Sequence, residues 1–216
     1  MSLCIEGRVA LASFTVFTIL ALYQVRIIYG DYWSYVYCIA TFGSACACVL
    51  VLPYNEIVKR SSFLGTVFGG TFVLWLNVDN PWKVFFLYMM ALSFFHFSEY
   101  LMTAMYNPHR LSLDSFLLNH SFEYKAAAVA SWVEFFIEAF LLPSSKSLYV
   151  ISSIGLFFVI FGEVLRKLAM ITAKSNFSHI VQSKKNDGHV LVTDGIYGYS
   201  RHPAYVGWFT WSIGNS

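Results

Sequence analysis

Six long apolar stretches dominate the sequence. Each is long enough to form a helix across the hydrocarbon core of a membrane, which takes about 20 mostly apolar residues. The stretches are Val9–Ile28, Trp33–Leu52, Ser62–Val78, Val84–Tyr106, Ala126–Leu142 and Leu148–Ala173. A seventh begins near Pro203 and runs to Ser216. The pattern predicts an all-α, multi-pass integral membrane protein with six full spans and a partial seventh.

The composition agrees with a membrane location. Charged residues make up 12% of the 216 residues, whereas soluble domains carry about 25%. Hydrophobic residues make up 57%, which leaves too little polar surface to cover a soluble protein. The net charge of +2 and the irregularly spaced cysteines give no sign of nucleic-acid binding or of a disulfide framework. The expected surroundings are therefore the lipid bilayer, with no nucleic-acid partner.

The basic residues are distributed unevenly between the two sides of the predicted spans. The loops that follow odd-numbered spans carry Arg26, Lys83 and Lys146, and the other eleven of the fourteen Lys and Arg residues lie on the opposite side. Because cytosolic loops are enriched in Lys and Arg, the N-terminus and the even-numbered loops are predicted to be cytosolic. The polar segment from Lys174 to His202 lies on the same predicted side.

Several ionisable residues lie inside the predicted spans, where a charge costs a few kcal/mol unless it faces a cavity or a partner. They are His96, Glu99, Glu134, Glu138 and Glu163. One interpretation is that they line a site; the other is that they join helices, or pair with Arg166 and Lys167. The His-x-x-Glu and Glu-x-x-x-Glu spacings fit part of a di-metal pattern, but the full ligand set is missing, so no metal site is predicted.

The long polar segment before the last helix is the second candidate for chemistry. The run His189–Val192 is expected to be extended, and its backbone could hold a purine edge or an amino-acid zwitterion. Tyrosines that could stack on a ligand follow it at positions 197, 199 and 205. Pro203 is suited to the first position of a helix, whose N-terminus attracts anions. The alternative is an interfacial loop whose tyrosines and basic residues anchor at lipid headgroups.

Ordered motifs within this segment and before it resemble those of one enzyme family. Arg201–Gly207 reads R-H-P-A-Y-V-G and resembles a signature that membrane methyltransferases share with sterol reductases. His189–Tyr197, Gly162–Met170 and Asn176–His179 resemble the elements H-x-L-V-T-x-G-x-Y, G-E-x-x-R-K-x-A-M and N-F-x-H. Ser115–Ser121 and His96–Tyr100 match as well. Together they resemble the isoprenylcysteine carboxyl methyltransferase family from about Phe95 onward.

The resemblance implies transfer of a methyl group from S-adenosylmethionine to the C-terminal carboxylate of a prenylated cysteine, forming a methyl ester. The implied partners are CaaX-processed proteins that carry a farnesyl or geranylgeranyl cysteine, at the endoplasmic reticulum membrane. The implied cofactor contacts are Gln182, His189, Val190, Leu191, Val192, Tyr197, His202, Pro203, Ala204 and Tyr205. Residues 1–173 would then form the helical bundle, and residues 174–216 a cytosolic cofactor-binding segment leading into a truncated helix.

The sequence departs from the family pattern at its end. In the family the chain continues past the R-H-P helix to an Arg and a Glu that hold substrate and cofactor, whereas this sequence ends thirteen residues after Pro203. No catalytic residue is therefore assigned, and weak or no activity is expected of the 216-residue form. The alternatives are an NADPH-dependent membrane sterol reductase and a truncated, non-catalytic membrane isoform.

Overall fold

The computed structural model describes residues 3–23, 43, 45–47, 55–118, 121–141, 149–179 and 190–215. Its long helices are α1 (Ile5–Tyr23), α3 (Glu56–Asn77), α4 (Trp82–Tyr106), α5 (Phe122–Leu141), α6 (Tyr149–Ala173) and α7 (Pro203–Gly214). Short 3₁₀ turns are η2 (Pro108–Arg110), η3 (Leu113–Phe116), η5 (Lys174–Asn176) and η6 (Gly195–Gly198). This part of the chain contains no strand, so the all-α prediction is confirmed for it.

Short polar residues and prolines determine where several helices begin. The side chain of Asn55 accepts a hydrogen bond from the backbone N–H of Ile57 and caps α3. Pro81 immediately precedes α4, and Pro203 occupies the first turn of α7. The capping residue Asn55 lies in the polar sequence that precedes the apolar stretch. Helix α3 therefore begins at Glu56 rather than at the predicted Ser62. The same effect starts α5 at Phe122, four residues before the predicted Ala126.

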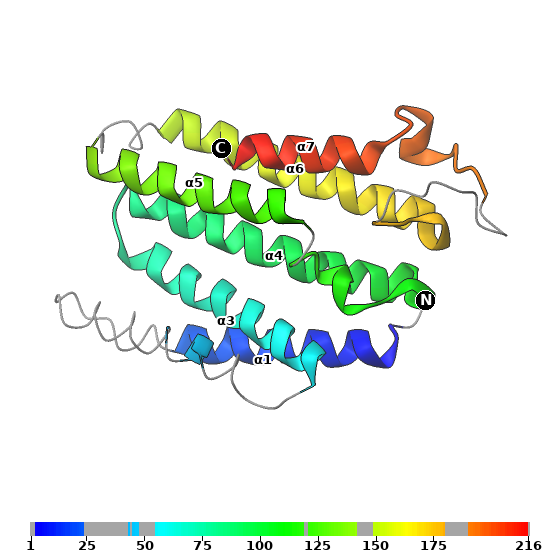
Figure 1. Cartoon of the computed structure of the whole chain (residues 1–216), viewed down its shortest axis with the longest axis horizontal. Helices are drawn as coiled ribbons and strands as arrows, with labels where there is room; N and C mark the ends of the chain where they lie inside the picture. Colours follow the sequence, from blue (N-terminus) through cyan, green and yellow to red (C-terminus); the bar gives the residue numbers. More distant parts are fainter. Residues whose placement is uncertain are drawn as a thin grey trace.

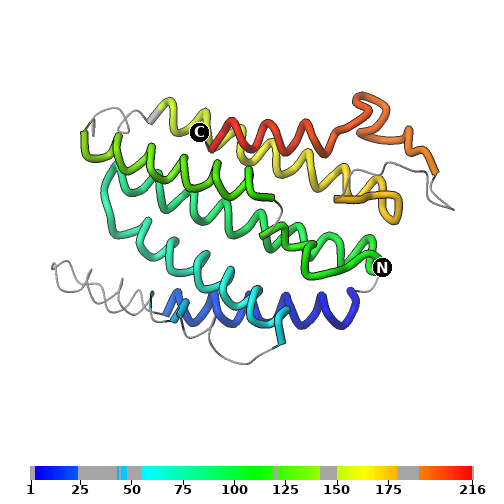
Figure 2. The backbone as a smooth tube through the Cα atoms, viewed as in Figure 1, coloured from blue at the N-terminus to red at the C-terminus, as the bar shows by residue number. Residues whose placement is uncertain are grey.

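Helix α4 lies in the middle of the bundle. It lies between the α1–α3 pair on one side and the α6–α7 pair on the other, with α5 alongside it (Figure 1). The beginnings of α1 and α7 and the ends of α4 and α6 lie at one end of the bundle (Figure 2). This end therefore gathers the segments that the distribution of basic residues places on one side of a membrane.

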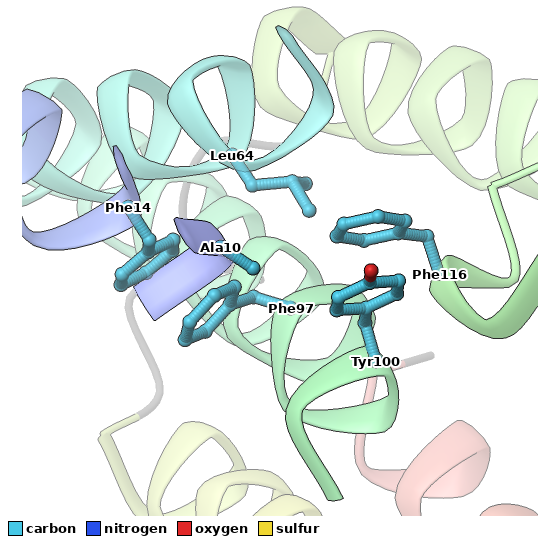
Figure 3. Packing of buried hydrophobic residues seen from close by; sticks show 6 residues of the cluster. All are labelled: Ala10, Phe14, Leu64, Phe97, Tyr100 and Phe116. Carbon is cyan, nitrogen blue, oxygen red and sulfur yellow. The ribbon is translucent and has the colours of Figure 1, made fainter. Parts of the chain in front are cut away.

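An aromatic cluster joins α1, α3, α4 and η3 (Figure 3). Its fully or almost fully buried members are Ala10, Phe14, Leu64, Phe97, Tyr100 and Phe116. The rings of Phe14 and Phe97 stack with centroids 3.8 Å apart, and those of Tyr100 and Phe116 with centroids 4.0 Å apart. A second cluster of Phe95, Leu117, Val159 and Trp211 joins α4 to α6 and α7. Together the two clusters anchor α4 on both sides.

Two of the described helices are long and apolar enough to cross a membrane, namely Ile5–Tyr23 and Trp82–Tyr106. Of the span predicted over Trp33–Leu52, the structure describes only residues 43 and 45–47, which are helical. The count of six full spans and a partial seventh therefore stays a prediction from the sequence.

Candidate functional site

A cavity of about 380 Å³ lies where α4, α5, α6 and α7 meet the segments 176–179 and 195–202. Its polar lining comes mostly from Arg166, Asn176, Ser178, His179, Arg201 and His202. Its apolar and aromatic lining comes from Phe95, Leu117, Tyr124, Phe177, Tyr197, Ala204, Tyr205 and Trp208. The volume is within the range of about 300–1,000 Å³ typical of small-molecule sites. The cavity thus presents polar and apolar surfaces to one ligand space.

A buried ion pair lies beside this cavity, with Arg166 in the lining and Glu99 behind it. The Nε and one Nη of Arg166 each donate to a different carboxylate oxygen of Glu99 over 2.8 Å, and both side chains are almost wholly buried. The other Nη of Arg166 donates to the carbonyl oxygen of Ala204 over 3.3 Å. The carboxylate of Glu99 also accepts from Lys167. The pair therefore connects α4, α6 and the first turn of α7.

A second carboxylate extends the network. The Nζ of Lys167 lies 3.2 Å from an oxygen of Glu163, and the hydroxyl of Ser98 donates to that same oxygen over 2.7 Å. For Glu99 and Glu163 the interpretation as partners of Arg166 and Lys167 is therefore confirmed. Neither carboxylate lines the cavity.

The segment 176–179 is attached to α4 by its polar side chains. The Nε2 of His179 lies 3.0 Å from the hydroxyl of Thr103, and its Nδ1 lies 3.4 Å from an oxygen of Glu99. The side chain of Asn107 donates to the carbonyl oxygen of Phe177 over 2.9 Å. The side chain of Asn176 accepts from the backbone N–H of Val190 over 2.9 Å. These bonds hold the segment where it lines the cavity.

Glycines bring α6 and α7 into backbone contact. A Cβ at Gly162 would lie 2.5 Å from the carbonyl oxygen of Gly207, and one at Gly207 would lie 2.7 Å from that of Gly162. One at Gly155 would lie 2.9 Å from the carbonyl oxygen of Gly214. Small residues at such positions allow membrane helices to approach closely. The close approach places Ala204 within reach of Arg166.

The structure brings some of the predicted cofactor contacts together and separates others. Tyr197, His202, Ala204 and Tyr205 line the cavity, while Pro203 is buried at the start of α7. The run Val190–Val192 forms no strand and does not line the cavity; Val190 and Leu191 are exposed. Gln182 and His189 lie outside the described residues.

The three candidate tyrosines differ in their surroundings. Tyr197 and Tyr205 line the cavity, and burial raises the pKa of the Tyr197 hydroxyl above its usual value. Tyr199 is 94% exposed and lines no part of the cavity. Tyr197 therefore presents a neutral, half-buried ring to a ligand, whereas Tyr199 is exposed outside the cavity.

Sequence reasoning missed the contribution of 176–179 and of Arg166 to the lining. In the sequence, Asn176–His179 is recognisable only as a family motif, which assigns no role to its side chains. The feature that could have indicated its place in the site is an Asn and a His that follow directly after a helix, in the longest polar segment. The apolar lining from Phe95, Tyr124 and Trp208 carried no such signal, because aromatic residues are abundant throughout the spans.

Comparisons with known proteins are consistent with the motifs. A profile of the isoprenylcysteine carboxyl methyltransferase family matches residues 154–216. Protein-S-isoprenylcysteine O-methyltransferase of Xenopus laevis is 51% identical over 203 residues, covering 94% of this chain and 68% of the relative. The protein of the same name from Homo sapiens is 55% identical over 162 residues, covering 75% of this chain and 57% of the relative. The chain thus spans 57–68% of the length of these two relatives.

A solved structure has the same fold. The eukaryotic intramembrane Ras methyltransferase, isoprenylcysteine carboxyl methyltransferase, superposes with a TM-score of 0.87 at 39% sequence identity. The superposition covers 98% of this chain and 78% of that one. The described helices therefore have the arrangement found in that membrane enzyme.

Proposed function

The chain belongs to the isoprenylcysteine carboxyl methyltransferase family, and from this premise we propose that it methylates the C-terminal carboxylate of prenylated cysteine. The observation that carries the proposal is the cavity at the junction of α4, α6 and α7, which combines polar and apolar linings. A prenylcysteine has the same dual character, because a charged carboxylate lies next to a long hydrocarbon chain.

S-adenosylmethionine is the proposed cofactor, and the residues of the cavity fit it. Tyr197 and Tyr205 offer aromatic faces, and Asn176 and His179 offer polar contacts. His202 forms no side-chain cap on α7, so the positive end of the helix is available to the cofactor carboxylate. By resemblance, Gln182, His189 and the backbone of Val190–Val192 complete the set. The proposal for Val190–Val192 rests on the resemblance alone, because these residues do not line the cavity.

Methyl transfer to a carboxylate requires little proton transfer by the protein. When bound, S-adenosylmethionine supplies a methyl group that its sulfonium has already activated. A terminal carboxylate has a reference pKa of about 3.5, so it is ionised at cytosolic pH and needs no general base. The residues of this chain would act by binding, orienting and excluding water. Arg166, already neutralised by Glu99, fixes the position of Ala204 and the start of α7.

The proposed location is the endoplasmic reticulum membrane, with six spans and a partial seventh, and with the N-terminus and the segment 174–202 in the cytosol. The excess of basic residues on that side supports this orientation. The clustering of the same segments at one end of the bundle also supports it. S-adenosylmethionine is cytosolic, so the orientation would bring cofactor and cavity to the same side. In this division, residues 1–173 form the bundle and 174–216 form the cofactor segment and its helix.

Methyl transfer in membranes tests the proposal. Membranes that contain the protein are incubated with S-adenosylmethionine labelled in its methyl group and with N-acetyl-S-farnesyl-cysteine. For a version of the chain extended past Ser216, the expected result is a base-labile methyl ester on the prenylcysteine. S-adenosylhomocysteine is also expected to raise the unfolding temperature of the purified protein, and NADPH is not. Stabilisation by NADPH without methyl transfer would instead support the sterol reductase alternative, which the named relatives do not favour.

A further inference from the structure

The hydrogen bonds of His96 determine which of its ring nitrogens carries the proton. Nδ1 lies 2.8 Å from the carbonyl oxygen of Phe116, which can only accept, so Nδ1 is the donor. In the neutral ring Nε2 is then an acceptor, and it lies 3.1 Å from the hydroxyl of Tyr124. The Tyr124 hydroxyl therefore donates to His96, and its ring packs edge-on against the imidazole.

This bond attaches the beginning of α5 to α4. At the other end of α5, aromatic rings make the contact: Phe135, Phe136 and Phe140 all pack on Trp82. The backbone of α5 does not approach its neighbours as closely as those of the other long helices do. The position of the Tyr124 ring therefore depends strongly on its bond to His96.

Tyr124 is the residue through which the described part of α5 lines the main cavity. It lies on the apolar side with Phe95, Leu117 and Trp208. A second cavity, of about 110 Å³, lies further along the same α4–α5 seam. Its lining is Val84, Phe85, Tyr88, Ser131, Trp132, Glu134, Phe135 and Asn215.

The spacing of lining residues places Tyr124 between the two cavities. Tyr88 precedes Phe95 by seven residues on α4, and Ser131 follows Tyr124 by seven on α5. Seven residues of helix are about 10 Å. Because α4 and α5 run in opposite directions, both steps lead the same way along the seam (Figure 1). The Tyr124 ring thus stands at the end of the main cavity, on the side toward the second one.

We infer that Tyr124, held in place by His96, limits the length of the prenyl chain that the enzyme accepts. The inference rests on the proposed function and adds a residue that determines specificity. The apolar side of the cavity takes the hydrocarbon chain, and the Tyr124 ring ends the space available to it. Without the ring, a longer chain extends into the second cavity. His96 is a positioning residue, because it acts through Tyr124.

The test compares farnesyl-cysteine and geranylgeranyl-cysteine substrates. Tyr124→Ala is expected to raise the ratio of kcat/KM for the geranylgeranyl over the farnesyl substrate about tenfold, since a single methylene in an apolar pocket already alters specificity to this extent. Tyr124→Phe keeps the ring and loses the hydroxyl. It is expected to raise KM for both substrates roughly three- to tenfold, the effect of one lost hydrogen bond, with little change in kcat.

Two further variants separate this effect from general damage to the fold. His96→Asn keeps a donor for the Phe116 carbonyl but loses the acceptor for Tyr124, so it is expected to reproduce Tyr124→Phe. Ser131→Phe fills the second cavity, and in the Tyr124→Ala background it is expected to cancel the preference for the longer chain. Phe122→Ala is the matched control, because Phe122 is 80% exposed on α5 and lines neither cavity.

A binding measurement separates the inference from the proposed function. Equilibrium binding of the two prenylcysteines to the purified protein in nanodiscs is measured alongside turnover. If the protein extended past Ser216 binds both but transfers no methyl group, while Tyr124→Ala still shifts the binding ratio, the inference stands and the proposed function fails. If methyl transfer proceeds and Tyr124→Ala changes neither ratio, the inference is overturned. A fall in S-adenosylhomocysteine affinity in Tyr124→Phe as large as the rise in KM for the prenylcysteines would also overturn the inference, since Tyr124 would then belong to the cofactor site.

Discussion

Glu99 on α4 and Arg166 on α6 form a bidentate ion pair, with two N–O distances of 2.8 Å and almost no exposure of either side chain. Each member of the pair has a further contact. Lys167 also contacts the carboxylate of Glu99, and Arg166 also donates to the carbonyl oxygen of Ala204. Removal of Glu99 would leave Arg166 buried without its carboxylate partner, whereas removal of Arg166 would leave Glu99 paired with Lys167 alone among the two basic residues of α6. This relationship links the stability of the bundle to the shape of the cavity.

The first prediction concerns this pair. Glu99→Gln is expected to lower the free energy of unfolding by about 3–5 kcal/mol, because Arg166 would remain buried without its counter-charge. Thermal unfolding of the purified protein in detergent measures the effect. Glu56→Gln is the control: its pairs with Lys59 and Arg60 are exposed, so a change of only about 0–1 kcal/mol is expected. Equal effects at the two sites would contradict the interpretation of the Glu99 pair.

Sequence reasoning predicted the helices better than their contacts. Apolar stretches predicted α3, α4, α5 and α6 because a helix in lipid must consist almost wholly of apolar residues. Arg166 and Lys167 are predictable as possible partners of the acids because charges are rare in such helices. Which acid meets which base cannot be read from the sequence, because 67 residues separate Glu99 from Arg166 and the rotation of each helix decides the pairing.

The candidate site was predicted in part, for a related reason. Tyr197, His202 and Ala204 belong to motifs that are contiguous in sequence, and the structure places all three at the cavity. Tyr124 and Phe95 belong to different helices that converge there only in three dimensions. Since apolar residues fill every span, no local pattern distinguishes those that line a cavity from those that face lipid or pack in the core.

The second prediction tests the close approach of α6 and α7. Gly162→Ala is expected to cost about 1–3 kcal/mol, because the added Cβ would overlap the backbone of Gly207 and Trp211. By displacing α7 it is also expected to weaken stabilisation by S-adenosylhomocysteine. Gly43→Ala is the control, since a Cβ there meets nothing within 4 Å among the described residues. Unaltered ligand-induced stabilisation in Gly162→Ala would show that the contact does not shape the cavity.

The third prediction distinguishes two neighbouring tyrosines. Tyr197→Ala is expected to weaken S-adenosylhomocysteine binding about tenfold, because the ring lines the cavity and burial favours its neutral form. Tyr199→Ala is expected to leave the affinity unchanged, since Tyr199 is 94% exposed. Isothermal titration of the two purified variants gives the comparison. A larger loss at position 199 than at 197 would place the ligand outside the cavity.

The fourth prediction concerns Asn176, whose side chain lines the cavity and accepts from the backbone N–H of Val190 over 2.9 Å. Asn176→Ala removes that acceptor and is expected to lower S-adenosylhomocysteine affinity roughly three- to tenfold, the effect of one hydrogen bond. Asn176→Asp keeps an acceptor oxygen and is expected to lose less. Asn77→Ala is the control, because the side chain of Asn77 also bonds to the backbone, donating to the carbonyl oxygen of Val73 on α3, but lies outside the cavity. Asn77→Ala is expected to lower thermal stability and to leave S-adenosylhomocysteine affinity unchanged. If Asn77→Ala reduced affinity as much as Asn176→Ala, the loss would reflect general weakening of the bundle rather than the link between Asn176 and Val190.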